Sequence, residues 1–168
     1  IEAVLGADCF DTVLVSTDSE EIASIAESYG VRVYNRPPEY ATDKMTVLEA
    51  LVAMMDDVPR HDIFSYFLPT CPLVSSEDIK EGVSLLDHRT GSVVSVVSYA
   101  DPGLTNSRYL QKYYKPSGAF YMSWWDNLIK NKNFFVGNVK GYEMPKKRSV
   151  DIDDLMDIRY AELILKGL

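Results

Sequence analysis

The amino-acid sequence predicts an α/β fold of three layers (α/β/α), in which helices cover both faces of a mostly parallel β-sheet. Apolar runs rich in β-branched residues alternate along the chain with segments whose apolar residues recur at helical spacing. This alternation is typical of right-handed βαβ units. The chain has 168 residues, enough for one hydrophobic core and too few for two ordinary domains. We therefore expect residues 1–168 to form a single domain.

The expected strands are short runs of β-branched and aromatic residues. They are Thr12–Ser16, Val31–Tyr34, Ile63–Leu68, Ser92–Val97, Gly118–Met122 and Val139–Met144, the last at a sheet edge. The polar, irregular stretch Ser98–Pro116 contains Pro102 and Gly103 and is expected to be a loop. In open α/β sheets, ligands bind beyond the carboxyl ends of the strands, so residues that follow strands are the first candidates for a site.

The expected helices combine apolar periodicity with residues typical of helix ends. They are the end of a helix at Ile1–Ala7, then Asp18–Tyr29, Val47–Met55, Ser75–Leu86, Trp124–Lys130 and Asp154–Leu165. The residues expected to cap or stop them are Asp18 with Glu21, Gly30, Thr42 or Asp43, Ser75 or Ser76, and Asp153. Because a doubly wound domain usually opens with a strand, we expect that further residues precede Ile1. We also expect a further block of residues between Pro102 and Tyr113.

Composition excludes several function classes. The net charge of −8 disfavours a broad nucleic-acid or acidic-membrane surface, although a small anion can still bind where cations gather locally. Cys9 and Cys71 lack metal-ligand spacing, and with only two histidines a zinc site is not expected. No apolar run approaches the length of a membrane helix. These observations favour a cytoplasmic enzyme or binding protein with reduced thiols.

The densest acidic cluster lies just before the last expected helix. Asp153 suits a helix cap, whereas Asp151 sits too early for that role. Two carboxylates at i and i+2 in extended backbone point to the same side, which suits a hard cation such as Mg²⁺ held by one or two carboxylates and substrate phosphates. Both interpretations, a cap and a metal site, remain open on the residues alone.

Other candidates are less specific. Arg36, fixed beside Pro37 and Pro38, is either a ligand-recognition residue or an ordinary exposed arginine. Adjacent aromatics, Phe134 with Phe135 and Trp124 with Trp125, are typical of a core or a subunit interface, or of a sugar pocket. The chain has no nucleophile elbow, Walker loop or GxGxxG sequence, so those enzyme classes are set aside.

A series of short motifs occurs in one order along nearly the whole chain. They are Val15–Asp18 with Glu21-Ile22, Arg36-Pro37-x-Glu39-x-Ala41-Thr42-Asp43, Pro69-Thr70-x-Pro72-Leu73 with Glu77-Asp78-Ile79, Gly118-Ala119-x-Tyr121, and Ser149–Asp153 with Asp157 and Ala161-Glu162. Together they resemble the acylneuraminate cytidylyltransferases, the CMP-sialic acid synthetases. The resemblance implies a nucleotide-diphospho-sugar transferase fold and a reaction of CTP with a nonulosonic acid that yields a CMP-sugar and pyrophosphate.

The resemblance also implies roles for individual residues. Asp151 and Asp153 match the catalytic pair that binds Mg²⁺, Arg36 an arginine near the cytosine, and Arg108 an arginine that meets the sugar carboxylate. Phe134 and Phe135 match an aromatic pair beside the acyl substituent of the sugar. The remaining substrate-binding candidates lie in the matching motifs and are Thr42, Asp43, Leu68, Thr70, Ser117 and Gly118.

The chain departs from the family pattern in several places. The strand and basic glycine-rich loop with which the family begins, and which holds the phosphates of CTP, have no match, and the stretch from Val97 to Tyr114 is short. Leu68 stands where the family has Gln, and Ser117 where it has Asn. Because Leu68 lacks an amide that could read polar groups of the sugar, we expect a substrate other than common sialic acid, such as legionaminic or pseudaminic acid.

Alternatives remain at this stage. One is a synthetase for the related sugar Kdo, and another is a nucleotide-binding protein without catalytic activity. We also expect a homodimer, with Trp124, Trp125 or the segment Tyr109–Tyr114 at its interface, because aromatics are dense there.

Overall fold

The computed structural model describes residues 1–42, 44–100 and 112–167. Its elements, in chain order, are α1 (Glu2–Ala7), β1 (Leu14–Thr17), α2 (Glu20–Ser28), β2 (Arg32–Asn35), η1 (Pro38–Tyr40), α3 (Val47–Asp57), β3 (Ile63–Phe67), α4 (Ser76–Ser84), β4 (Ser92–Ala100), β5 (Lys112–Trp124), α5 (Trp125–Asn131), β6 (Val139–Glu143), η3 (Lys146–Arg148) and α6 (Leu155–Leu165). Every expected helix and strand is present, with shifted ends.

The strands form a four-stranded sheet in the order β3-β5-β4-β6 and a separate parallel pair, β1-β2. Strand β6 runs parallel to β4 and lies at the edge of the sheet, as expected. Strand β5 is antiparallel to both of its neighbours, so the four-stranded sheet is mixed. The physical reason is the short connection from β4 to β5, since a parallel crossover needs roughly a dozen residues or more, usually with a helix.

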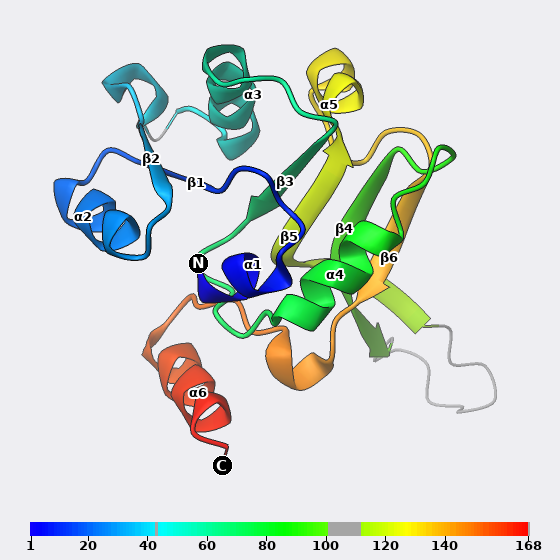
Figure 1. Ribbon diagram of the computed structural model, residues 1–168. Coiled ribbons are helices and arrows are strands. Elements are labelled where there is room, and N and C mark those ends of the chain that lie inside the picture. The colour runs from blue at the N-terminus through cyan, green and yellow to red at the C-terminus, as the bar shows by residue number, and fades with distance from the viewer. Residues whose placement is uncertain (43, 101–111, 168) are drawn as a thin grey trace.

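Helices cover both faces of this sheet (Figure 1). The neighbouring residues Val93 and Val94 of β4 point to opposite faces, because side chains alternate along a strand. Val93 belongs to a core cluster with Ala7 of α1 and Ile79 of α4. Val94 belongs to a second cluster, with Met55 of α3 and residues of α5. The three-layer α/β class is therefore confirmed.

The stretch expected to be a loop is partly strand. Strand β4 continues to Ala100 and β5 begins at Lys112, so a loop throughout Ser98–Pro116 is wrong at both ends. Cross-strand aromatic contact accounts for the extension, since the rings of Tyr99 and Tyr113 lie 5.8 Å apart. Arg108, Tyr109 and most of the block expected between Pro102 and Tyr113 lie outside the described residues.

Several expected caps are corrected. Gly30 follows α2 with φ +74°, and Ser75 caps α4 in a capping box with Asp78, both as expected. The other N-caps lie one to several residues further along the chain, at Ser19 instead of Asp18, Thr46 instead of Thr42 or Asp43, and Asp154 instead of Asp153. For Thr46 and Asp154, an acidic residue three positions later completes a capping box, which explains the preference.

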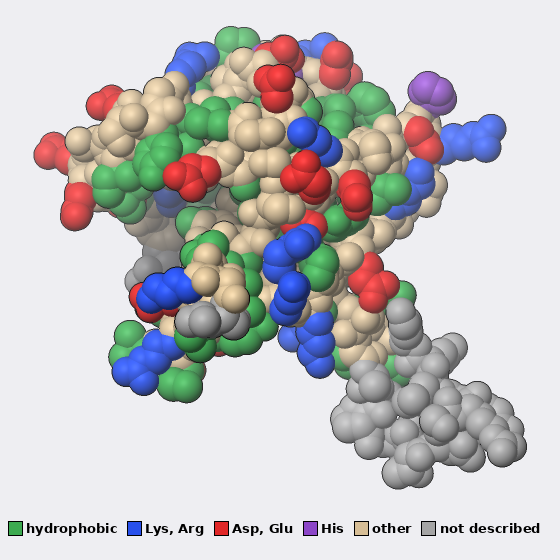
Figure 2. All heavy atoms as spheres, turned by 60° about the horizontal axis from the view of Figure 1, so that its bottom comes forward, with side chains coloured by type: hydrophobic (Ala, Val, Ile, Leu, Met, Phe, Trp, Pro, Cys, Tyr) green, Lys and Arg blue, Asp and Glu red, His purple; other side chains and the backbone are tan. Residues whose placement is uncertain are grey.

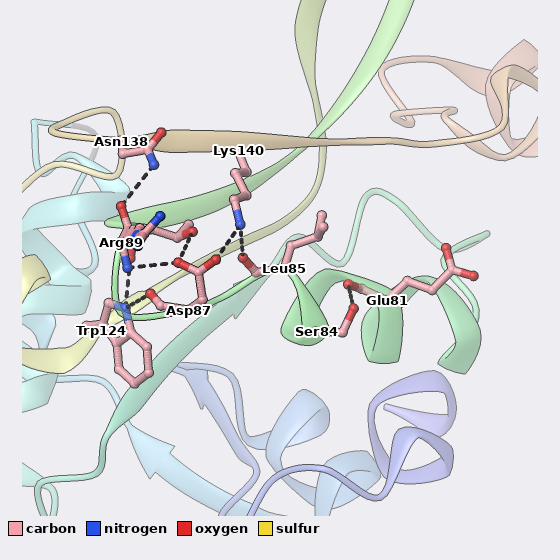
Figure 3. A network of polar contacts seen from close by, with 9 residues as sticks. Glu81, Ser84, Leu85, Asp87, Arg89, Trp124, Asn138 and Lys140 are labelled. Carbon is pink, nitrogen blue, oxygen red and sulfur yellow. Dashed lines mark hydrogen bonds and ion pairs between the residues drawn. The ribbon is translucent and has the colours of Figure 1, made fainter.

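Both tryptophans make contacts within this chain. Trp125 is buried against Phe64, with ring centroids 6.0 Å apart. The Trp124 indole donates to the carbonyl oxygens of Thr90 and Asp87, at 2.8 and 3.3 Å (Figure 3). The fold therefore explains these residues without a partner subunit.

Asp87 stabilises the turn before β4. We call this turn, with Asp87 and its partners Arg89, Thr90 and Lys140, the Asp87 turn. The Asp87 carboxylate accepts hydrogen bonds from the backbone amide of Arg89 at 2.8 Å, the Thr90 hydroxyl at 3.0 Å and the Lys140 ammonium at 2.9 Å. Figure 3 shows how these contacts join the turn to β6.

None of the helices in the described ranges is long and apolar enough to cross a membrane.

Candidate functional site

The two candidate metal ligands, Asp151 and Asp153, lie in the exposed segment between η3 and α6. Asp154 caps α6, accepting hydrogen bonds from the backbone amides of Met156 and Asp157 at 2.7 and 3.1 Å. Asp157 in turn accepts from the amides of Asp153 and Asp154. The cap interpretation of Asp153 is therefore wrong. Neither candidate carboxylate caps the N-terminus of α6.

Asp151 lies against the middle of β5. A β-carbon built on Gly118 would lie 3.3 Å from the Asp151 Oδ2 atom, 3.1 Å from Cys71 Sγ and 3.2 Å from Leu68 Cδ1. Gly118 also has φ +86°, a conformation that other residues rarely adopt. Leu68, Gly118 and Asp151, which are far apart in the sequence, thus converge at one point, as a shared site requires.

A large bulge in β5 places Ser117 and Gly118 there. Along β4 the pairing moves from Val94 to Val96, while on β5 it moves from Tyr121 to Pro116. The buried Ser95 hydroxyl fills the gap in the ladder, donating to the Phe120 carbonyl at 3.0 Å and accepting from the Phe120 amide at 2.9 Å. Bulges of this kind are frequent beside active sites because they redirect the chain out of the ladder.

The loop after β3 is joined directly to the acidic segment. The Ile152 amide donates to the Thr70 carbonyl at 2.9 Å, and the Cys71 amide donates to the Leu68 carbonyl at 3.2 Å. The Ile152 amide lies between the two candidate carboxylates in sequence, so this bond fixes their position relative to Thr70. The structure thus brings together Leu68, Thr70, Ser117, Gly118, Asp151 and Asp153.

Cys71 is a buried neighbour of both carboxylates. Burial, followed by the negative charges of Asp151 and Asp153, raises the pKa of the Cys71 thiol to about 12. The thiol lies 3.5 Å from the Ser117 carbonyl, to which it donates. A thiol with this pKa stays protonated at neutral pH, so Cys71 cannot serve as a thiolate nucleophile there.

Ser117 carries a buried hydroxyl that has no hydrogen-bond partner within the described part of the chain. Such orphaned hydroxyls are uncommon in proteins, because leaving a buried polar atom unpaired costs free energy. Because Ser117 lies beside Gly118 and Cys71, a bound ligand can form a hydrogen bond with this hydroxyl.

Tyr66, Tyr121, Phe134 and Phe135 form an aromatic wall. Tyr66 and Tyr121 are cross-strand neighbours with stacked rings 6.3 Å apart. The ring of Tyr121 lies 5.5 Å from that of Phe134 and 6.2 Å from that of Phe135. Phe134 is buried, whereas Phe135 is 54% exposed.

Tyr121 joins the wall to the acidic segment. Burial, and then the neighbouring Cys71 and Asp151 side chains, raise the pKa of its hydroxyl. Tyr121 was part of a motif, but its role in the site was missed, and so were Tyr66 and Cys71. Only the β3-β5 pairing and the loop after β3 bring these residues to the site, and neither arrangement can be read from the sequence.

Arg36 follows β2 at the carboxyl end of the parallel pair. It lines a cavity of about 370 Å³ together with Thr17, Asp18 and Asn35. Its guanidinium donates to the Ser16 carbonyl at 2.8 Å, while its buried Nε atom has no partner among the described residues. Burial raises the pKa of the Tyr66 hydroxyl, and the positive charge of Arg36 opposes this increase.

The remaining candidates are not drawn into the site. Thr42 is exposed in a turn, where its carbonyl accepts from the Met45 amide at 3.0 Å. Asp43 and Arg108 lie outside the described residues.

Basic residues precede the carboxylates. Lys146, Lys147 and Arg148 form the short helix η3. Figure 2 shows Lys and Arg side chains gathered on one face of this acidic molecule. Local positive charge of this kind attracts small anions even when the net charge is negative.

Asp151 and Asp153 can supply only part of the ligand shell of Mg²⁺. Within the described part of the chain, no group of three or more His, Cys, Asp or Glu residues is arranged to hold a metal ion. Mg²⁺ commonly takes one or two carboxylates and completes its shell with water and substrate phosphates. Asp151 and Asp153, both exposed and free of capping duty, suit that role.

The chain is similar to known cytidylyltransferases along most of its length. A family model described as "Cytidylyltransferase" matches residues 1–140. N-acylneuraminate cytidylyltransferase of Escherichia coli O18:K1:H7 is 33% identical over 96% of this chain, which spans 43% of that relative. CMP-N,N'-diacetyllegionaminic acid synthase of Legionella pneumophila is 28% identical over 99% of this chain and 83% of its own length. The chain thus spans less than half the length of the first of these relatives.

A solved structure agrees with the fold. The structure of CMP:2-keto-3-deoxy-manno-octonic acid synthetase complexed with CTP superposes with a TM-score of 0.74, covering 99% of this chain and 86% of its own. At 14% sequence identity, this likeness establishes the fold alone.

Proposed function

The chain belongs to the cytidylyltransferase family, and we propose that the protein transfers the cytidylyl group of CTP to a nonulosonic acid. In this reaction the anomeric hydroxyl oxygen of the sugar bonds to the α-phosphorus of CTP. The bond from that phosphorus to the oxygen bridging to the β-phosphate breaks, and pyrophosphate leaves. The hydroxyl proton goes to solvent. The products are a CMP-sugar and pyrophosphate.

The convergence of Asp151 on Gly118 carries this proposal. It joins the acidic segment, the β5 bulge and the loop after β3 at one point. Asp151 and Asp153 would hold Mg²⁺, and a bound Mg²⁺ supplies neutralisation of phosphate charge. The chain's own residues then mainly position the reactants, which is the main task in phosphoryl and nucleotidyl transfer.

We assign the two ends of the site to the two substrates. The cavity with Arg36 suits the cytosine end of CTP, because the arginine side chain carries several hydrogen-bond donors. Phe134 and Phe135 suit the apolar acyl substituent of the sugar. The reacting phosphate would sit at Asp151, beside Gly118.

The substrate proposed is a nonulosonic acid other than common sialic acid. Leu68 presents a methyl group to the space over Gly118 and cannot read a polar substituent there. A leucine side chain favours apolar surface on the ligand, because a polar group placed against it loses its water without gaining a partner.

We also propose a cytoplasmic homodimer. The cytoplasm is where CTP is available. A partner subunit would cover the exposed Tyr114, 49% exposed on β5 near the end of the ribbon that it forms with β4. The tryptophans are left out of this interface, because Trp125 is buried and Trp124 is hydrogen-bonded within the chain.

A pyrophosphate-release assay tests the proposal. The protein is incubated with Mg²⁺, one of CTP, UTP, ATP or GTP, and one of N-acetylneuraminic, legionaminic, pseudaminic acid or Kdo. We expect release only with CTP and a nonulosonic acid. Pyrophosphate release with CTP and Kdo, but with none of the other acids, would support the alternative synthetase. Binding of CTP without pyrophosphate release under any condition would support a nucleotide-binding protein without catalytic activity.

A further inference from the structure

The two segments that form the acidic side of the site are joined at a second, buried place. The first joint is the bond from the Ile152 amide to the Thr70 carbonyl. The second is an ion pair between Arg148 of η3 and Asp78 of α4. Asp78 lies just after the loop that carries Thr70, and Arg148 lies just before Asp151.

Both oxygens of the Asp78 carboxylate are in use. Oδ2 accepts hydrogen bonds from the Ser75 amide at 2.8 Å and the Ser75 hydroxyl at 2.7 Å, which ends the loop and starts α4. Oδ1 accepts from the Tyr142 hydroxyl at 2.8 Å and from the Arg148 guanidinium. Elements α4, β6 and η3 thus meet on one carboxylate that is only 1% exposed.

The charge of Asp78 is retained despite its burial. Burial by itself raises the pKa of this carboxyl, but the bonds from Ser75 and Tyr142 and the charge of Arg148 outweigh burial, and the pKa is lowered. Buried ion pairs are poor sources of stability, since desolvation offsets their attraction, and their best-attested use is to fix one arrangement. This one also leaves Arg148 Nε buried with no partner among the described residues.

The position of the pair explains what it can fix. Arg148 lies three residues before Asp151, and Ile152 lies one residue after it. An extended chain advances about 3.3–3.6 Å per residue, so Asp151 is held between two anchored points within a short span. Loss of either anchor would let the carboxylates move away from Gly118.

We propose that Asp78, Tyr142 and Arg148 are positioning residues that hold the Asp151 and Asp153 carboxylates in place for a divalent cation. This inference rests on the proposed function of the carboxylate pair. Outer residues of this kind commonly change metal affinity by about 10- to 100-fold when they are removed.

The test measures Mn²⁺ binding to the intact protein, from the loss of the free-ion electron paramagnetic resonance signal. We expect Arg148→Met and Tyr142→Phe to weaken Mn²⁺ binding, the former by about tenfold or more. The double variant Asp78→Asn/Arg148→Met removes both charges, so it should regain thermal stability relative to Arg148→Met while Mn²⁺ binding stays weak. A purely structural pair would instead show affinity recovering together with stability.

The matched control is Asp87→Asn in the Asp87 turn, which breaks another Asp pairing far from the carboxylates in the sequence (Figure 3). It should leave Mn²⁺ binding unchanged. A second reference is Asp151→Asn. If it abolishes Mn²⁺ binding while the Arg148 and Tyr142 variants bind like wild type, the positioning inference is overturned and the metal assignment stands. If Asp151→Asn also binds like wild type, the metal assignment itself fails.

Discussion

The carboxylate of Asp151 lies over Gly118, with its Oδ2 atom 3.3 Å from the point that a β-carbon at residue 118 would occupy. This contact links the acidic segment before α6 to the bulge in β5. Because Cys71 and Leu68 crowd the same point at 3.1 and 3.2 Å, a β-carbon at this position would force its neighbours to shift. The site therefore depends on a glycine at residue 118.

Gly118→Ala should lower both stability and turnover. A positive φ costs a residue with a β-carbon about 1–2 kcal/mol, and the added carbon would also displace Asp151. Gly137→Ala is the matched control, since Gly137 has φ +80° with no atom within 4 Å of the added carbon. We expect both variants to lose similar backbone stability in urea unfolding, and only Gly118→Ala to lose more than tenfold in kcat/KM. Equal activity in the two variants would contradict the site.

Asp151 and Asp154 should separate catalysis from stability. Asp154→Ala removes the cap of α6 and should cost about 1 kcal/mol, with turnover preserved. Asp151→Asn and Asp153→Asn leave the cap intact and should melt like wild type, while turnover falls by about 10²-fold or more, because charge neutralisation at the phosphates is lost. Melting temperatures and pyrophosphate release decide the matter. A stable, fully active Asp151→Asn would defeat the metal assignment.

Cys71 should resist alkylation. With its pKa raised to about 12, about one thiol in 10⁴ is ionised at pH 8. Cys9 is exposed, and although burial raises its pKa as well, it should react with iodoacetamide well before Cys71 does. Peptide mass spectrometry over time measures the order of modification. Faster reaction at Cys71 would show that its surroundings are open in solution.

The Asp87 turn should contribute a stability that depends on pH. The Lys140 ammonium, the Arg89 amide and the Thr90 hydroxyl hold the pKa of Asp87 below its ordinary value. The folded state therefore keeps Asp87 ionised where the unfolded chain is protonated. This contribution is complete above the unfolded pKa of about 3.9 and is lost as the pH falls further, through the lower folded pKa.

The corresponding measurement compares wild type with Asp87→Asn in urea unfolding at pH 7, 5 and 3. The wild type should be the more stable at pH 7 and 5, and the difference in unfolding free energy should shrink at pH 3. A difference that stays constant across this range would mean that the ionisation of Asp87 does not support the turn.

Local patterns predicted most of the elements but fewer of their ends. Runs such as Ser92–Val97 predicted strands because β-branched side chains suit a pleated surface. The caps at Thr46 and Asp154 were displaced from the predicted ones, yet each has its acidic partner three residues later, so the sequence contained the information needed to find them. What misled the prediction was an earlier polar residue that also suits a cap.

Features that depend on pairing between distant strands could not be predicted. The β5 bulge is stabilised by the Ser95 hydroxyl, which replaces backbone hydrogen bonds of Phe120 in the strand ladder. Ser95 and Phe120 are far apart in the sequence. The same register sets Tyr66 beside Tyr121. The family resemblance identified Asp151 and Gly118, but only the fold shows that they lie close together and that Asp78 and Arg148 form an ion pair.

The most direct test of the account is mass-spectrometric detection of the product. The protein is incubated with CTP, Mg²⁺ and a panel of nonulosonic acids, and CMP-sugars are measured for wild type, Asp151→Asn and the Asp87→Asn control. We predict a CMP-sugar from at least one acid with wild type and with Asp87→Asn, and little or none with Asp151→Asn. The account would be contradicted if wild type binds CTP but forms no CMP-sugar from any acid, or if Asp151→Asn forms it at the wild-type rate.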